Sequence, residues 1–194
     1  MRLFHLPLLI AFSAIFSSAT AAEDLCSTIP DIQQHSEIGC DCGAALSGLS
    51  GLPAKAPKGM SLIAVCGFKK VEFVGTVGEF FFKGTSTVKG QVMRVKDPIL
   101  GDIVRFKAKS AGKQSALQTL KFGSDSPANL KFRTPALTDE SPCWAAEAII
   151  NVSLLNVHVG YESDADGSYP KDFEVLKVGQ YSPCQIEEAG DDED

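Results

Sequence analysis

From residue 61 onward, the chain consists of short runs in which apolar and polar residues alternate, separated by clusters of Gly, Pro, Asp and Ser. Alternation with a period of two places successive side chains on opposite faces of a β-strand, so each run predicts a strand with one buried face. A series of short strands with turn residues between them predicts a mainly β domain, either a single small OB-like barrel or a β-sandwich. The runs expected to form strands are residues 71–76, 79–83, 86–95, 101–109, 116–122, 130–132, 149–159 and 173–178.

Glycines inside two of these runs bear on the choice between barrel and sandwich. Gly75 and Gly90 interrupt predicted strands, and a glycine there is typical of a bulge or of the sharp bend of a barrel. The barrel is therefore the favoured architecture. Residues 141–150 allow a second interpretation, a short helix, because Ser141-Pro142 is a good helix start and the alanines that follow favour one.

The N-terminus has the organisation of a secretory signal peptide over residues 1–21. Arg2 precedes an apolar stretch from Leu6 to Phe16, and Ala19 and Ala21 satisfy the small-x-small cleavage rule. The apolar stretch is shorter than the roughly 20 residues that a membrane-spanning helix needs, and no other segment is long enough. We therefore expect a cleaved leader, no transmembrane segment and a secreted or periplasmic protein.

An even number of cysteines in an exported chain predicts disulfides, because oxidising compartments allow them to persist. Cys143 is expected to pair with Cys184, and the four N-terminal cysteines among themselves. Cys40 and Cys42 are too close together for the usual zinc spacing of about two to four intervening residues, and they lack the Cys-x-x-Cys spacing of redox motifs. The six cysteines expected to form disulfides are Cys26, Cys40, Cys42, Cys66, Cys143 and Cys184.

These features divide the chain into four parts. After the signal peptide, residues 22–60 are expected to form a disulfide-pinned segment of loops, with a short helix near residues 31–38. Residues 61–184 form the predicted β-rich domain. Residues 185–194 are rich in Asp and Glu, and we expect them to be an exposed, disordered acidic tail.

Charge is distributed unevenly between the middle and the end of the chain. Residues 67–133 hold 13 basic and 5 acidic residues, a net charge of +8, whereas residues 134–194 hold 2 basic and 14 acidic residues, a net charge of −12. A basic sheet indicates a surface for an anionic polymer or surface such as a polysaccharide, lipid headgroups or nucleic acid. The opposing interpretation is that these lysines only solvate strand faces. The candidate ligand-binding residues are Lys89, Arg94, Lys96, Arg105, Lys107 and Lys109.

Nucleic-acid binding would be favoured if Phe80, Phe81 and Phe82 were exposed, because aromatic side chains stack on bases. Alternation predicts that at least one of the three points inward, and the others could pack under a loop. The acidic tail could in addition fold over the basic region and block it.

The residues that could carry chemistry are few. His158 is expected on a strand, and a hydrolase would need it to act with a nearby carboxylate such as Glu162 or Asp164. Glu162, Asp164 and Asp166 alternate before Gly167, which resembles the first half of a calcium loop. The twelfth position of that loop is Phe173 instead of Glu, so an ordinary turn is favoured over a calcium site. No cofactor other than this calcium ion is indicated.

The leading functional hypothesis is an exported, disulfide-stabilised binding module for a polyanion, because the chain combines a basic sheet with no recognisable catalytic constellation. Two alternatives stay open. One is an exported hydrolase that uses His158, which predicts that this residue lines a pocket. The other is a structural or partner-binding protein without a small-molecule site.

Overall fold

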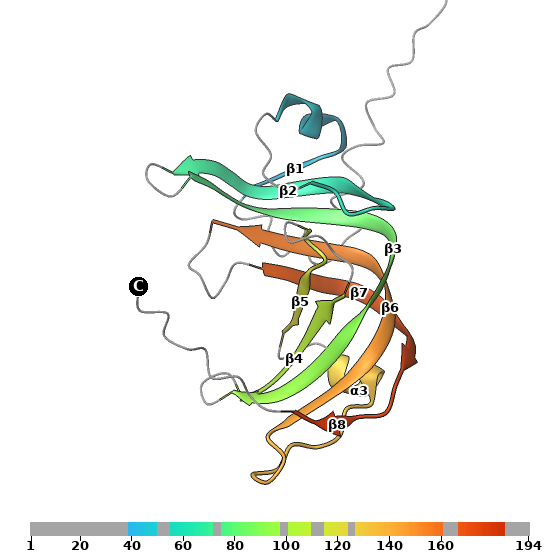
Figure 1. The fold of residues 1–194 in the computed structure, drawn as a ribbon. Helices are drawn as coiled ribbons and strands as arrows, with labels where there is room; N and C mark the ends of the chain where they lie inside the picture. The colour runs from blue at the N-terminus through green and yellow to red at the C-terminus, as the bar shows by residue number, and fades with distance from the viewer. Residues whose placement is uncertain are drawn as a thin grey trace, which may run out of the picture.

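A computed structural model of the chain describes residues 39–49, 55–71, 75–97, 101–109, 115–123, 127–160 and 167–184. The expected signal peptide, the helix near residues 31–38, the carboxylates at 162–166 and the acidic tail lie outside these ranges. The described elements are mainly β, as predicted (Figure 1). They are β1 (Cys40–Cys42), a 3₁₀ helix η2 (Gly43–Gly48), β2 (Met60–Val71), β3 (Gly75–Asp97), β4 (Gly101–Ala108), β5 (Thr119–Phe122), α3 (Ala128–Phe132), β6 (Cys143–Val159), β7 (Gly167–Val178) and β8 (Ser182–Pro183).

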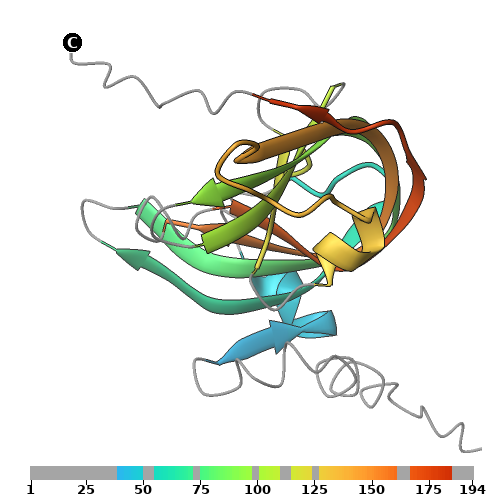
Figure 2. The same ribbon diagram turned by 90° about the horizontal axis from the view of Figure 1, so that it is seen from below.

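Five of the strands close into a ring. Strands β3, β4 and β5 follow one another as antiparallel neighbours, β5 meets β7 in parallel, β7 pairs with β6, and β6 returns to β3. The view from below in Figure 2 shows the curved strands bending around a common interior. The five strands form a closed ring, with α3 between the third and fourth of them in the chain, which agrees with the small-barrel alternative of the fold prediction.

The two longest strands, β3 and β6, hold the ring together. The first half of β3 lies between β2 and β6, and its second half lies between β4 and β6. The pairing of β3 with β6 shifts register between Lys83 and Ser86. Both strands are strongly bent along their length (Figure 1). Such bulges increase the local twist and allow a long strand to serve two sides of a barrel.

The main core fills the inside of the ring. Phe80 and Phe82 point into it, whereas Phe81 points to the opposite face of β3 and contacts a second, smaller cluster with Ala64 and Cys66. All three phenylalanines are 0% exposed. The second cluster is covered from the side of β1, so burial on both faces explains why the apolar run Phe80–Phe82 shows no alternation. These rings are therefore not a stacking platform for bases.

Two sequence-based predictions about local structure were wrong at the far end of the barrel. Residues 130–132 belong to α3 instead of a strand. Ala128 and Phe132, one helical turn apart, bury their side chains against the core, while Pro127 suits the start of a helix. The suggested helix at 141–150 is also absent, because β6 starts at Cys143 and pairs with β3 throughout that stretch.

The predicted strand at 71–76 is in fact the two ends of a hairpin. Val71 is the last residue of β2, Gly75 is the first residue of β3, and the two pair with each other. Gly75 therefore lies at a chain reversal, which is a different reason for glycine than the bulge expected from the sequence.

Two disulfides connect strands at different places in the sheet. Cys143 is bonded to Cys184, as predicted, and fastens the end of β8 to the start of β6. Cys40 is bonded to Cys66 across the β1–β2 pair. Cys42 is also disulfide-bonded. Each such bridge typically contributes about 2–4 kcal/mol by constraining the unfolded chain. None of the helices in the described ranges has the length and apolar character needed to span a membrane.

Candidate functional site

Basic side chains gather on the outer face of the ring because β4 alternates strictly. Val104 and Phe106 are buried in the core. The residues next to them in the alternating pattern, Arg105 and Lys107, therefore point outward and are exposed. Lys109, directly after β4, is exposed as well. Residues two apart on a strand are separated by about 7 Å. Strand β4 and the residue that follows it therefore present three cations in a line.

The strands on either side of β4 widen this line into a patch. The backbone of Lys109 donates a hydrogen bond to the carbonyl of Lys89 on β3, which places these lysines on neighbouring strands. On the other side, Arg105 lies directly opposite Lys121 of β5. The same face also carries uncharged side chains. Gln91 of β3, for example, lies opposite Lys107 of β4. We call the set Lys89, Arg105, Lys107, Lys109 and Lys121 the basic face.

The members of the basic face differ in how they are neutralised. Lys109 Nζ lies 2.8 Å from Glu147 Oε1 on β6, an exposed ion pair. Lys89, Arg105 and Lys107 form no ion pair with any carboxylate in the described part of the chain. Lys121 also takes part in an interaction within the protein.

Two predicted ligand-binding residues lie elsewhere. Arg94 shares its side of β3 with the core-facing valines, and its guanidinium binds Asp102 at 2.7 Å and the carbonyl of Pro135 at 2.8 Å. Lys96 Nζ lies 2.8 Å from Asp139 Oδ1. The hydrogen bond and charge of Asp139 raise the pKa of the Lys96 ammonium, and the same contact lowers the pKa of the Asp139 carboxyl. Both cations are thus engaged within the protein.

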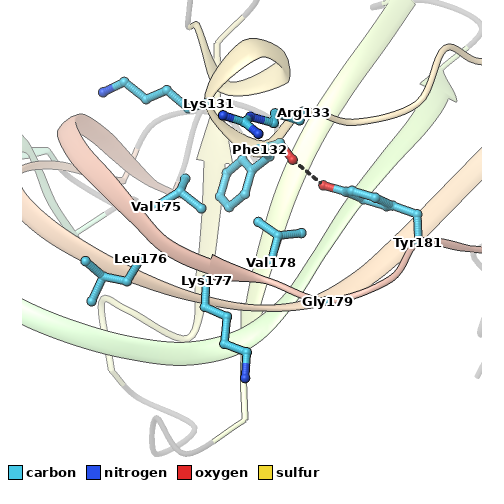
Figure 3. Close-up of a pocket in the computed structure, with 9 residues that line it drawn as sticks. All are labelled: Lys131, Phe132, Arg133, Val175, Leu176, Lys177, Val178, Gly179 and Tyr181. Carbon is cyan, nitrogen blue, oxygen red and sulfur yellow. Dashed lines mark hydrogen bonds between the residues drawn. The ribbon is translucent and has the colours of Figure 1, made fainter.

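A concave feature lies between α3 and β7 (Figure 3). Tyr181 reaches across it and donates a hydrogen bond to the carbonyl of Phe132 at 2.9 Å. Burial raises the pKa of the Tyr181 hydroxyl to about 12. Lys131 Nζ donates to the carbonyl of Phe173 at 2.6 Å and lies 4.2 Å from the centre of its ring. The groove has a volume of about 430 Å³ and is lined by Lys131, Phe132, Arg133, Val175, Leu176, Lys177, Val178, Gly179 and Tyr181.

His158 belongs to a polar cluster between β3 and β6. Its Nε2 lies 3.4 Å from Glu79 Oε2 and 2.9 Å from Asn156 Nδ2, and that amide also donates to Glu79 at 2.9 Å. Glu79 and Asn156 are buried, and the ring of Tyr169 lies 4.7 Å from the imidazole. His158 is not among the residues that line the groove between α3 and β7. The carboxylates that a hydrolase was expected to use, Glu162 and Asp164, lie outside the described residues.

The calcium hypothesis concerns Glu162, Asp164 and Asp166, which are all outside the described ranges. Within those ranges, no group of three or more His, Cys, Asp or Glu side chains is arranged to hold a metal ion.

Sequence reasoning missed several of these groups for different reasons. Lys121 could have been predicted to face outward, because it lies between the apolar residues Leu120 and Phe122 of a predicted strand. Glu79 and the residues of the groove could not be found, since their neighbours are distant in the chain: Asn156 is 77 residues from Glu79. No local pattern signals such a contact.

Comparison with known proteins adds no assignment. No protein-family model, curated protein or solved structure matches the chain.

Proposed function

We propose that this protein is an exported binding module for an acidic polysaccharide, which lies along the basic face of β3, β4 and β5. The observation that carries the proposal is the line of outward cations on β4, next to Lys89, of which Arg105 and Lys107 have no carboxylate partner within the described residues. The disulfides Cys40–Cys66 and Cys143–Cys184 support an oxidising compartment outside the cytosol.

The chemistry of the face favours a polysaccharide over a single-stranded nucleic acid. Proteins that bind single strands without sequence preference stack the bases on exposed aromatic rings. Phe106 and Phe122 of β4 and β5 point into the core, and the apolar run Phe80–Phe82 is fully buried. The described part of the face offers charges and hydrogen-bond donors, which suffice for sulfate and carboxylate groups. By analogy with the fold alone, the second and third strands of OB barrels bind oligonucleotides as well as oligosaccharides, so the choice between them rests on the exposed side chains of β4 and β5.

The strength of individual contacts argues for a polymer. An exposed ion pair contributes only about 0.2–1 kcal/mol, so a single sugar acid on this face would be held weakly. Cations spaced about 7 Å apart along β4 can engage successive anionic groups of one chain. Once the first group is bound, the others act at a high effective concentration.

Affinity for heparin, a highly sulfated probe, tests the proposal. The chain from residue 22 should be retained on a heparin column, and the triple variant Lys89→Gln, Arg105→Gln, Lys107→Gln should elute at clearly lower salt. These residues form no ion pair with a described carboxylate, so their replacement breaks no known internal bridge. In a salt titration, each lost contact should reduce the slope of log affinity against log salt by somewhat less than about one.

The matched control removes three charges from exposed positions away from this face: Lys69→Gln, Lys70→Gln, Lys83→Gln. It has the same net charge as the first variant and should elute close to the parent protein. An equal loss in both variants would mean that only net charge matters, and it would overturn the assignment of the site. Failure of the parent to bind heparin even at low salt would overturn the function itself.

A further inference from the structure

An acidic side chain borders the basic face on the side of β6. Glu147 of β6 lies opposite Gln91 of β3, and Gln91 lies opposite Lys107 of β4. Residues directly opposite each other on paired strands point to the same side of a sheet. The neighbours of Glu147 in the chain, Ala146 and Ala148, are buried in the main core, so its carboxylate points outward. Glu147 and the cations of β4 therefore share one face, two strand spacings of about 4.8 Å apart.

The Glu147 carboxylate occupies one of the cations of the basic face. Its Oε1 lies 2.8 Å from Lys109 Nζ, and the side chains of Glu147 and Lys109 are 59% and 64% exposed. An ion pair this exposed is weak, worth a factor of about five or less in an equilibrium constant. The backbone of Glu147 is held independently, because it pairs with β3 and its carbonyl accepts a hydrogen bond from Gly179 at 2.8 Å. The carboxylate can therefore leave Lys109 without a change in the sheet.

We infer that Glu147 competes with the acidic polysaccharide for Lys109 and so limits the affinity of the basic face. The inference rests on the proposed function and deepens it, because it names a residue that regulates that site. The ligand first engages Lys89, Arg105 and Lys107, which have no carboxylate partner among the described residues. A polymer held there presents its next anionic group beside Lys109 at a high effective concentration. That group replaces the Glu147 carboxylate, which then faces the bound polymer and repels it.

Replacement of Glu147 by glutamine has two effects on polysaccharide binding, and both raise the affinity. It frees the Lys109 ammonium for the ligand, and it removes a negative charge that borders the bound polymer. Only the first effect requires Lys109. A double-mutant cycle with Lys109→Gln therefore separates competition for this lysine from the general electrostatic field.

The cycle compares heparin binding by the whole chain from residue 22, Glu147→Gln, Lys109→Gln and the double variant. At low salt, Glu147→Gln should bind heparin about two- to fivefold more tightly than the parent. In the Lys109→Gln background the same substitution should raise the affinity clearly less, because no cation is freed. Asp41→Asn is the charge-matched control, since it removes one exposed negative charge from β1, which β2 and β3 separate from β4. This control should bind heparin like the parent.

The outcomes separate this inference from the proposed function. If the parent binds heparin and Glu147→Gln binds no more tightly, the inference is overturned and the proposed function stands. The same holds if the gain from Glu147→Gln is equal with and without Lys109, or if Asp41→Asn gives a gain of the same size, because charge alone would then explain the result. Failure of all these proteins to bind heparin at low salt would overturn the proposed function, and the inference with it.

Discussion

At Gly90 the absence of a side chain allows two strands of the ring to approach closely. Gly90 is buried on the inner side of β3, next to Phe106 of β4. A β-carbon at this position would lie 2.7 and 2.8 Å from Cε1 and Cζ of the Phe106 ring, and it would overlap the carbonyl oxygen of Lys107. Gly90 therefore allows an aromatic ring to pack closely against the backbone. The sequence pattern alone predicted a bulge or a sharp bend at this position.

Gly90→Ala should destabilise the protein by about 1–3 kcal/mol, because the added methyl group overpacks a filled interior. Urea denaturation measures this loss as a lower midpoint with an unchanged slope. Gly123→Ala is the control, since a β-carbon there meets nothing within 4 Å. Equal stability of the two variants would contradict the packing role of Gly90.

Elements at the lower end of the barrel in Figure 1 show how tertiary contacts override local preference. The alanines at 145, 146 and 148 favour a helix by propensity, yet all three are buried in β6 and aligned with β3. A helix in this stretch would lose the backbone pairing between β6 and β3 that closes the ring. The short α3 forms instead where Phe132 can enter the core, stacked on Phe106 and Phe173.

The segment between β7 and β8 is tied to α3 by Tyr181, and its ionisation should loosen that contact. The pKa of Tyr181 is about 12 in the folded protein, raised from 10.0 by burial. Because the folded-state pKa is the higher one, the stabilisation is complete below about pH 10 and is lost as the pH rises towards 12. Absorbance at alkaline pH should show one tyrosine titrating late, and Tyr181→Phe should remove that phase. A late phase that persists in the variant would assign it to another tyrosine.

Across the whole molecule, one continuous sheet connects the basic face to β8, after which the acidic C-terminal residues follow in the chain. A row of paired residues runs from Ser182 on β8 through Ala145 and Met93 to Arg105. Three strand spacings of about 4.8 Å therefore separate β8 from the centre of the basic face. The disulfide of Cys184 fixes the point at which the acidic residues 185–194 leave the barrel. These residues carry the negative charges of Glu187, Glu188, Asp191, Asp192, Glu193 and Asp194.

Truncation after Cys184 should therefore raise the affinity for heparin several-fold at low salt, because six negative charges attached close to the basic face are removed. The gain should shrink as salt increases, since screening acts over about 10 Å at 0.1 M. Salt-dependent retention of the truncated and the full chain measures the effect. A variant of the same length with the six acids replaced by Asn and Gln should behave like the truncated one. Equal retention of the truncated and the full chain on heparin at every salt concentration would contradict this prediction.

Local pattern was sufficient for strand β4 and most of β6, and for the outward direction of Arg105 and Lys107, since a sheet with one buried face imposes a period of two on neighbouring residues. Local pattern could not predict that the Arg94 guanidinium binds Asp102 and the carbonyl of Pro135, because those partners belong to other segments.

The sequence favoured a barrel, but local pattern could not predict which strands close it, for the same reason. The ring is completed by Leu120 beside Ser168, and the groove arises where α3 meets β7, far apart in the chain. Alternation records only which side of a strand is buried. Which strands meet, and which charges are left facing solvent, depends on contacts between distant residues, and these exist only once the chain has folded.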